Sequence, residues 1–209
     1  MIILIFLSFA LIHSITVSQR FKQICMRIFG ETFMRVWYRF IYNVVSGITV
    51  ALAFTLIYQI PDRIIWIGPL WFRWCMHIIQ LGGLVFGARA FEHLDAAEFL
   101  GFKQVLRYVT RHETAGNIEG LSQRELVTTG VYGIVRHPMY FAGIVIFTFE
   151  PNITVNGLVI TILADLYFIF GSFIEERRFV DTFGERYKEY QEKVPRLIPR
   201  LFGPRAGEQ

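Results

Sequence analysis

Polar side chains in residues 136–140 form a candidate binding site. Arg136 and His137 come directly before Pro138, which lacks an N–H group and suits the first turn of a helix. A helix is therefore expected to begin at His137-Pro138, where free N–H groups, the positive dipole end and Arg136 favour an anion. His137 and Tyr140 share one face of that helix. An imidazole and a phenol would thus point toward the same ligand.

A pair of carboxylates, Glu175 and Glu176, closes the apolar region that follows Met139. Carboxylates accept hydrogen bonds from ammonium and hydroxyl groups. A ligand with a carboxylate, an ammonium, sugar hydroxyls and a planar ring would match both polar ends of this region, and S-adenosylmethionine carries all four groups. On these residues alone a simpler alternative stays open, in which Arg136 marks only a helix start and Glu175-Glu176 only a solvated helix end.

The order of motifs between residues 126 and 196 is more specific than any one of them. The motifs are, in chain order, Leu126-Val-Thr-Thr-Gly-Val-Tyr132, Arg136-His-Pro-Met-Tyr140, Glu175-Glu-Arg177, Phe183-Gly-Glu-Arg-Tyr187 and Val194-Pro-Arg196. As a set they resemble the integral membrane methyltransferases related to isoprenylcysteine carboxyl methyltransferase and phospholipid methyltransferase.

This resemblance implies a pocket that encloses S-adenosylmethionine between an apolar helical hairpin and a tail helix. Leu126 and Val127 would contact the cofactor through their backbone. Arg136, the cation beside the helix start, is also expected to bind the cofactor. The side chains that the resemblance implies as contacts are Tyr132, His137, Pro138, Met139, Tyr140 and one of Glu175 or Glu176.

A looser similarity lies upstream. His93-Leu-Asp95, followed by Phe99-Leu-Gly-Phe-Lys-Gln-Val105, looks like the branch that includes methanethiol S-methyltransferase and the NnrU proteins. The chain departs from the thiol enzymes between Thr110 and Gln123, where its link into the Gly-x-Tyr motif is longer and more polar. The identity of the methyl acceptor therefore stays open.

The leading hypothesis is methyl transfer from S-adenosylmethionine to a small or lipophilic thiol, such as methanethiol. A thiol must lose its proton to become a nucleophile, so a nearby base would help. The expected base is His93, oriented by Asp95. The alternatives are carboxyl methylation of a prenylcysteine-like substrate, N-methylation of a lipid amine, a membrane reductase, and a non-enzymatic NnrU-like membrane protein.

Composition indicates an integral membrane protein. The 209 residues are 54% hydrophobic with a mean hydropathy of +0.43. This hydrophobic fraction is higher than that of a typical soluble domain. A helix needs ~20 apolar residues to cross a bilayer, and residues 1–17, 40–60, 72–91 and 153–174 meet or approach that length. Residues 139–149 are shorter. We expect an all-α polytopic fold with about five transmembrane helices, the last two a hairpin, plus cytoplasmic amphipathic helices.

The placement of charge predicts the orientation of the chain in the membrane. Of 21 Lys and Arg residues, five lie between Arg20 and Arg39, five between Lys103 and Arg136, and eight from Arg177 to Arg205. If the spans alternate, these lie on one side, and the positive-inside bias makes that side cytoplasmic. The N-terminus would be outside, with the motifs and the C-terminus inside. No basic segment has a nucleic-acid-binding signature, so no nucleic-acid partner is expected.

Two regions are expected, an N-terminal transmembrane scaffold at 1–91 and a cytoplasm-facing cofactor region at 92–209. Cys25 and Cys75 form no CxxC pair, which argues against a disulfide framework and a zinc site. His93, Asp95 and His112 lack the spacing of a metal motif, so no metal is expected. The expected partners are a small-molecule or lipophilic substrate and membrane lipid.

Overall fold

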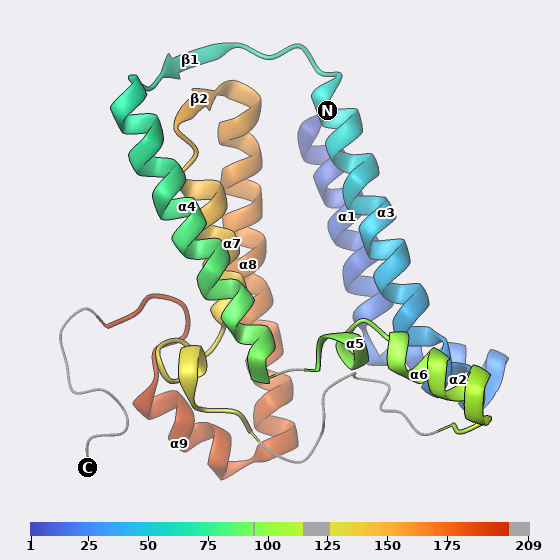
Figure 1. Cartoon of the computed structure of the whole chain (residues 1–209). Helices are drawn as coiled ribbons and strands as arrows, with labels where there is room; N and C mark the ends of the chain where they lie inside the picture. The colour runs from blue at the N-terminus through green and yellow to red at the C-terminus, as the bar shows by residue number, and fades with distance from the viewer. Residues whose placement is uncertain (94, 115–125, 201–209) are drawn as a thin grey trace. The chain divides into compact units, whose positions relative to one another are not determined.

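The computed structural model of the protein describes residues 1–93, 95–114 and 126–200 (Figure 1). These residues are mostly helical, as expected, with two short strands. They form two compact units, one of residues 1–61 with 95–114 and one of residues 62–93 with 126–200. The predicted boundary between a scaffold at 1–91 and a cofactor region at 92–209 concerns function and stays a prediction. In the structure, the apolar segment 72–91 packs with the C-terminal elements.

The first unit is built around two apolar helices joined by an amphipathic one. Tyr38 donates a hydrogen bond to the backbone oxygen of Thr16, which ties the start of the third helix to the end of the first. The second helix buries Cys25 and Met34 and exposes Ile28, so its faces differ as those of an amphipathic helix do. The helices of this unit are α1 (Ile2–Val17), α2 (Gln19–Val36), α3 (Tyr38–Tyr58), α5 (Ala96–Phe99) and α6 (Phe102–Arg111).

The second unit packs α4 against α7 and α7 against α8, and a two-stranded antiparallel sheet joins their ends (Figure 1). In that sheet Ile64 pairs with Thr154 and Ile67 with Asn152. The Asp62 carboxylate accepts a hydrogen bond of 3.0 Å from the Asn156 N–H in the first turn of α8. The elements are β1 (Ile64–Ile67), α4 (Leu70–Ala90), the 3-10 turns η1 (Phe91–His93) and η2 (Gly130–Gly133), α7 (Pro138–Thr148), β2 (Asn152–Thr154), α8 (Val155–Phe183) and α9 (Glu185–Lys193).

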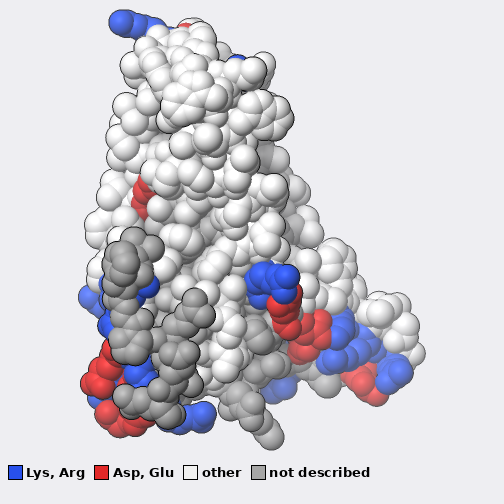
Figure 2. All heavy atoms as spheres, turned by 60° about the vertical axis from the view of Figure 1, so that its left-hand side comes forward, with Lys and Arg blue, Asp and Glu red and all other residues white. Residues whose placement is uncertain are grey.

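By length and apolar composition, α3 and α8 are candidate membrane spans, and the pair α1 and α2, bent by 61°, is a third. The described residues thus hold at most three candidate spans, against the five predicted, because α7 is only 11 residues long and α4, at 21 residues, is not among the candidates either. On the face shown in Figure 2 the long helices carry mostly uncharged side chains. At 29 residues α8 extends about 44 Å, which exceeds the hydrocarbon thickness of ~30 Å and leaves its last turns beyond it.

Two glycines of α4 allow it to approach α7 closely. A Cβ atom at Gly83 would lie 2.7 Å from Val145 Cγ1, and one at Gly87 would lie 2.8 Å from Ala142 Cβ. Both distances are too short for carbon atoms in contact. The Gly83-x-x-x-Gly87 spacing therefore marks a helix-packing face, as small residues do in membrane proteins.

We expect Gly87→Ala to lower the free energy of unfolding by about 1–3 kcal/mol, because the new methyl group overpacks the α4–α7 contact. Gly82→Ala is the matched control, since nothing lies within 4 Å of its Cβ position. That control should be neutral or slightly stabilising, because alanine favours helix. Thermal unfolding of the three proteins in detergent measures the difference. Equal melting temperatures for both variants would contradict this packing.

Candidate functional site

The predicted helix start at Pro138 is present, and the C-terminal tail holds it in place. Pro138 is the first residue of α7, and His137 is the residue before it. The backbone N–H groups of Arg136 and His137 donate to the carbonyl oxygens of Pro195 at 2.9 Å and Arg196 at 3.1 Å. Segments about 60 residues apart in sequence are thus joined by main-chain hydrogen bonds.

Glu176 is the centre of a buried network of ion pairs and hydrogen bonds. Its Oε1 accepts from Arg136 Nε at 2.6 Å, and its Oε2 accepts from Gln191 Nε2 and Arg196 Nε, each at 3.0 Å. The side chains of Arg136 and Glu176 are only 7% and 4% exposed. Arg136 also donates to the backbone oxygens of Gln191 and Val194. The network therefore joins the α7 start, α8 and the tail after α9.

His137 lies between the two predicted carboxylates. Its Nδ1 is 3.3 Å from Glu175 Oε2 and its Nε2 is 3.3 Å from Glu176 Oε1. Its ring stacks on that of Tyr140, with ring centroids 5.4 Å apart and planes within 6°. Burial opposes the charged form, but the hydrogen bonds to Glu175 and Glu176 outweigh it and raise the pKa of His137. Two carboxylates beside the ring thus favour its protonated form.

This raised pKa predicts how stability depends on pH. His137 contributes stability that is fully present below its unfolded pKa of about 6.5 and is lost as pH rises through the higher folded value. We expect wild type to exceed His137→Gln in melting temperature by more at about pH 5.5 than at about pH 9. A gap that is constant or that widens with pH would show that the imidazolium is not stabilised in the folded state.

Aromatic side chains surround the network. Tyr190 Oη donates to the Tyr132 backbone oxygen at 2.5 Å. Burial and the nearby Glu175 carboxylate raise the pKa of Tyr132 to about 12, so its phenol stays protonated. Tyr187 and Tyr190 form the buried core under the tail, and Leu126 and Phe179 pack against it. Val127 and Tyr140 are half-buried.

The two carboxylates differ in exposure. The Glu175 side chain is 33% exposed, whereas that of Glu176 is 4% exposed and surrounded by its partners. Met139 is also partly exposed, at 37%. A ligand can therefore reach Glu175 and Met139. Glu176 and Arg136 are buried and form an ion pair with each other.

Two buried donors close to this cluster have no hydrogen-bond partner among the described residues. They are Arg178 Nε, two residues beyond Glu176 on α8, and Tyr187 Oη. Tyr187 lies within electrostatic range of both Glu176 and Arg136. Because both atoms are donors, a ligand with acceptor oxygens would satisfy them.

The predicted base and its orienting carboxylate fall in different units, His93 in the second and Asp95 in the first. His93 is the last residue of η1, and its side chain lies outside the described residues. Asp95 caps α5 by accepting from the Glu98 N–H at 3.1 Å and pairs with Lys103. The hydrogen bond from Lys103 and, to a smaller extent, that from the Glu98 N–H hold the pKa of Asp95 below its ordinary value. Whether Asp95 orients His93 stays a prediction.

Gln191 and Arg196 are the main residues that the sequence did not single out as part of this site. Arg196 lies over the Phe173 ring, with 3.6 Å between its Cζ and the ring centroid, in addition to binding Glu176. The Val194-Pro-Arg196 motif was the available signal for Arg196. Within the described ranges, no three His, Cys, Asp or Glu side chains are grouped as a metal site requires.

Comparisons with known proteins agree with the predicted resemblance. Methanethiol S-methyltransferase of Pseudomonas deceptionensis is 36% identical over 104 residues, which are 50% of this chain and 37% of that protein. Methanethiol S-methyltransferase 2 of Bradyrhizobium diazoefficiens is 28% identical over 202 residues, which are 94% of this chain and 71% of that protein. Protein-S-isoprenylcysteine O-methyltransferase of Schizosaccharomyces pombe is 37% identical over 80 residues, which are 36% and 34% of the two chains.

The chain spans between about a quarter and two thirds of the length of the first three curated relatives that it matches. No solved structure matches it. The relatives confirm the resemblance to the superfamily of isoprenylcysteine methyltransferase-like proteins. The family model described as NnrU protein matches residues 1–193. This chain therefore belongs to the NnrU family.

Proposed function

We propose that the protein is an S-adenosylmethionine-dependent membrane methyltransferase whose acceptor is a small or lipophilic thiol. The observation that carries the proposal is the assembly of Arg136-His137, Glu175-Glu176 and the tail into one site, in a chain whose relatives are named as methyltransferases. The finer fold belongs to the same proposal, with five crossings, a C-terminal hairpin, an outer N-terminus and a cytoplasmic site.

The residues of the site divide into two groups. Glu175, the half-buried Tyr132 and Tyr140, and the exposed Met139 are proposed to contact the cofactor. His137 and Pro138 complete this set from the helix start, with Leu126 and Val127 contributing backbone atoms. Arg136 and Glu176 are proposed to act through the others, as positioning residues, because each is buried and has the other as partner.

The chemistry of S-adenosylmethionine fits this set of residues. The cofactor supplies a methyl group on a sulfonium centre. The Glu175 carboxylate can accept hydrogen bonds from an ammonium or from ribose hydroxyls, and the unpartnered donors Arg178 Nε and Tyr187 Oη can serve a carboxylate. The aromatic rings around His137 exclude water from the reacting groups, and the fixed positions of the side chains orient them.

Transfer to a thiol also needs a proton acceptor. The bound cofactor would supply the methyl group to the acceptor sulfur and leave as the thioether, and the thiol proton would pass to a base. His93 is the proposed base. A carboxylate acceptor would already be ionised and would need none.

A methyl-transfer assay with purified protein and labelled cofactor tests the proposed acceptor and base together. The acceptors are methanethiol, longer alkyl thiols, a prenylcysteine and a phospholipid amine. We expect transfer to thiols, and we expect His93→Ala to lower the rate most near pH 6, where little thiolate exists. Transfer to the prenylcysteine or the amine instead would reassign the acceptor. A His93→Ala rate equal to wild type from pH 6 to 9 would remove the base.

The second candidate function is non-enzymatic, with the same elements serving as a packing or partner-binding module. The family match supports it, because that match covers residues 1–193 without requiring any activity. Binding of S-adenosylhomocysteine separates the two functions. A protein that binds none at millimolar concentration would fit this second function.

A further inference from the structure

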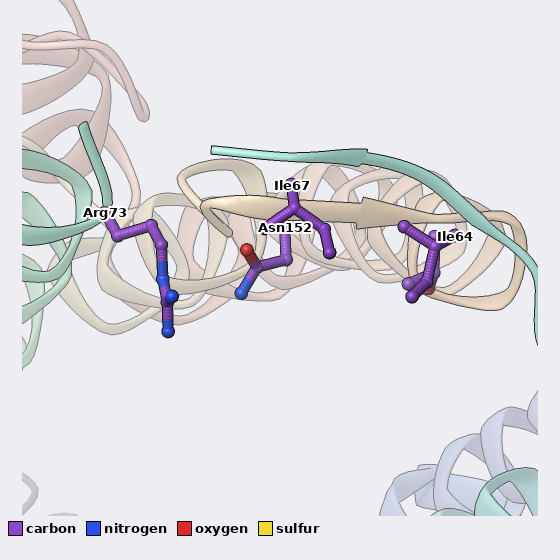
Figure 3. Close-up of a pocket in the computed structure, with 5 residues that line it drawn as sticks. Ile64, Ile67, Arg73 and Asn152 are labelled. Atoms are coloured by element: carbon purple, nitrogen blue, oxygen red, sulfur yellow. The ribbon is translucent and has the colours of Figure 1, made fainter. Parts of the chain in front are cut away.

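A surface hollow lies at the end of the second unit remote from Glu176. It measures about 300 Å³ and is lined by Ile64, Ile67, Arg73, Asn152 and Thr154. In Figure 3 the labelled side chains from β1, β2 and α4 extend to the same side of the strands. Thr154 and Glu176 stand at opposite ends of a helical run of about 30 Å, so this hollow is separate from the candidate functional site.

Arg73 gives the hollow an exposed positive charge with no carboxylate partner among the described residues. Its side chain is exposed in the first turn of α4, and no ion pair or hydrogen bond joins its guanidinium to any residue that the structure describes. Asp62 lies two residues before β1, and its carboxylate already accepts hydrogen bonds from the N–H groups of Asn156 and Arg63. Glu150, the other carboxylate near the sheet, does not line the hollow. The five donors of Arg73 therefore suit an external anion.

Asn152 supplies a neutral polar group in the same hollow. Its carboxamide oxygen is buried and has no hydrogen-bond partner among residues 1–93, 95–114 and 126–200. A carboxamide can both donate and accept hydrogen bonds. An anion that also carries hydroxyl or ammonium groups would match Arg73 and Asn152 together. The isoleucines beside them would contact the apolar part of the same molecule.

A second hollow continues along α4 from the same arginine. It measures about 240 Å³ and is lined by Leu70, Arg73, Trp74 and His77. Trp71 and Trp74 are 69% and 63% exposed, as tryptophans are at the level of lipid headgroups. An arginine at this level, with apolar surface running away from it along a helix, matches a phosphate with an attached hydrocarbon chain.

We propose that Arg73 binds the phosphate of a membrane phospholipid, with Asn152 contacting its headgroup and an acyl chain lying along Leu70 and Trp74. Free inorganic phosphate could bind the same guanidinium, because both ligands carry a phosphate anion. Only the lipid also has an acyl chain, and the second hollow offers a surface for that chain. This site does not depend on methyl transfer.

The test is native mass spectrometry of the purified protein in detergent, titrated with phosphatidylglycerol, for wild type, Arg73→Gln and Arg63→Gln. Arg63 is the matched control, since it is exposed on the same end and lines neither hollow. We expect Arg73→Gln to bind the lipid at least about tenfold more weakly, because a charge-assisted hydrogen bond is lost. Arg63→Gln should match wild type.

A second arm replaces the lipid with inorganic phosphate. We expect no saturable binding of phosphate at concentrations where the lipid saturates the site. Equal lipid affinity for wild type and Arg73→Gln, with both shown to be folded by circular dichroism, would overturn the proposal. So would binding of inorganic phosphate as tight as that of the lipid, since the acyl chain would then contribute nothing.

Discussion

Glu176→Ala is expected to lower the free energy of unfolding by about 3–5 kcal/mol, which for a chain of this length lowers the melting temperature by roughly 6–20 °C. The reason is the buried Arg136 guanidinium, which loses its carboxylate partner and remains surrounded by protein. An unpaired buried charge is far more costly than a lost surface ion pair. Arg196 and Gln191 would lose the same acceptor.

Thermal unfolding in detergent measures this effect, and a double variant identifies its cause. In Arg136→Met with Glu176→Leu both charges of the pair are replaced by apolar groups, so part of the lost stability should return. Arg196 still loses its partner, so the return is not complete. A Glu176→Ala protein that melts within about 1 °C of wild type would show that Glu176 does not hold the site together.

Glu175→Gln is expected to act on ligand affinity and not on stability. Its carboxylate is one third exposed, and its ion pair with His137 contributes at most about 1 kcal/mol. Loss of a hydrogen bond from a charged ligand group costs about 1.5–3 kcal/mol, so affinity for S-adenosylhomocysteine should fall about 10- to 150-fold. The melting temperature without ligand should stay close to that of wild type.

Glu150→Gln is the matched control for this variant, because Glu150 is an exposed carboxylate in the same unit with no place in the site. Calorimetric titration of wild type and both variants gives the three affinities. If Glu175→Gln binds as tightly as Glu150→Gln, then Glu175 is not a ligand contact and the division between the two glutamates is wrong.

Local signals in the sequence were sufficient for the elements that begin or pack on a few residues. Pro138 predicted the start of α7, because its missing N–H is tolerated only in the first turn of a helix. The spacing of Phe179, Phe183, Tyr187 and Tyr190, at intervals of three and four, is typical of an apolar helix face, and the structure buries both tyrosines with both phenylalanines packed against them. Periodicity of this kind can be read from a short window of sequence, because it does not depend on distant segments.

Contacts between distant segments were beyond the sequence. The pairing of β1 with β2, which joins segments about 90 residues apart, has no local signal in the sequence. The apolar segment 153–174 ends before Glu175-Glu176, but no glycine or proline follows Glu176 until Gly184, where φ is +60°, and α8 continues to Phe183. Two adjacent glutamates look alike in a sequence, and only tertiary packing makes Glu176 buried and Glu175 accessible.

Direct binding of S-adenosylhomocysteine to the purified wild-type protein tests the central claim most directly. Isothermal titration calorimetry in detergent should show saturable binding of about one molecule per chain, at concentrations well below millimolar, and Glu175→Gln should weaken it. Heat that does not saturate at millimolar ligand, from a protein shown to be folded by its cooperative melting, would contradict the assignment of a cofactor site to Arg136-His137 and Glu175-Glu176.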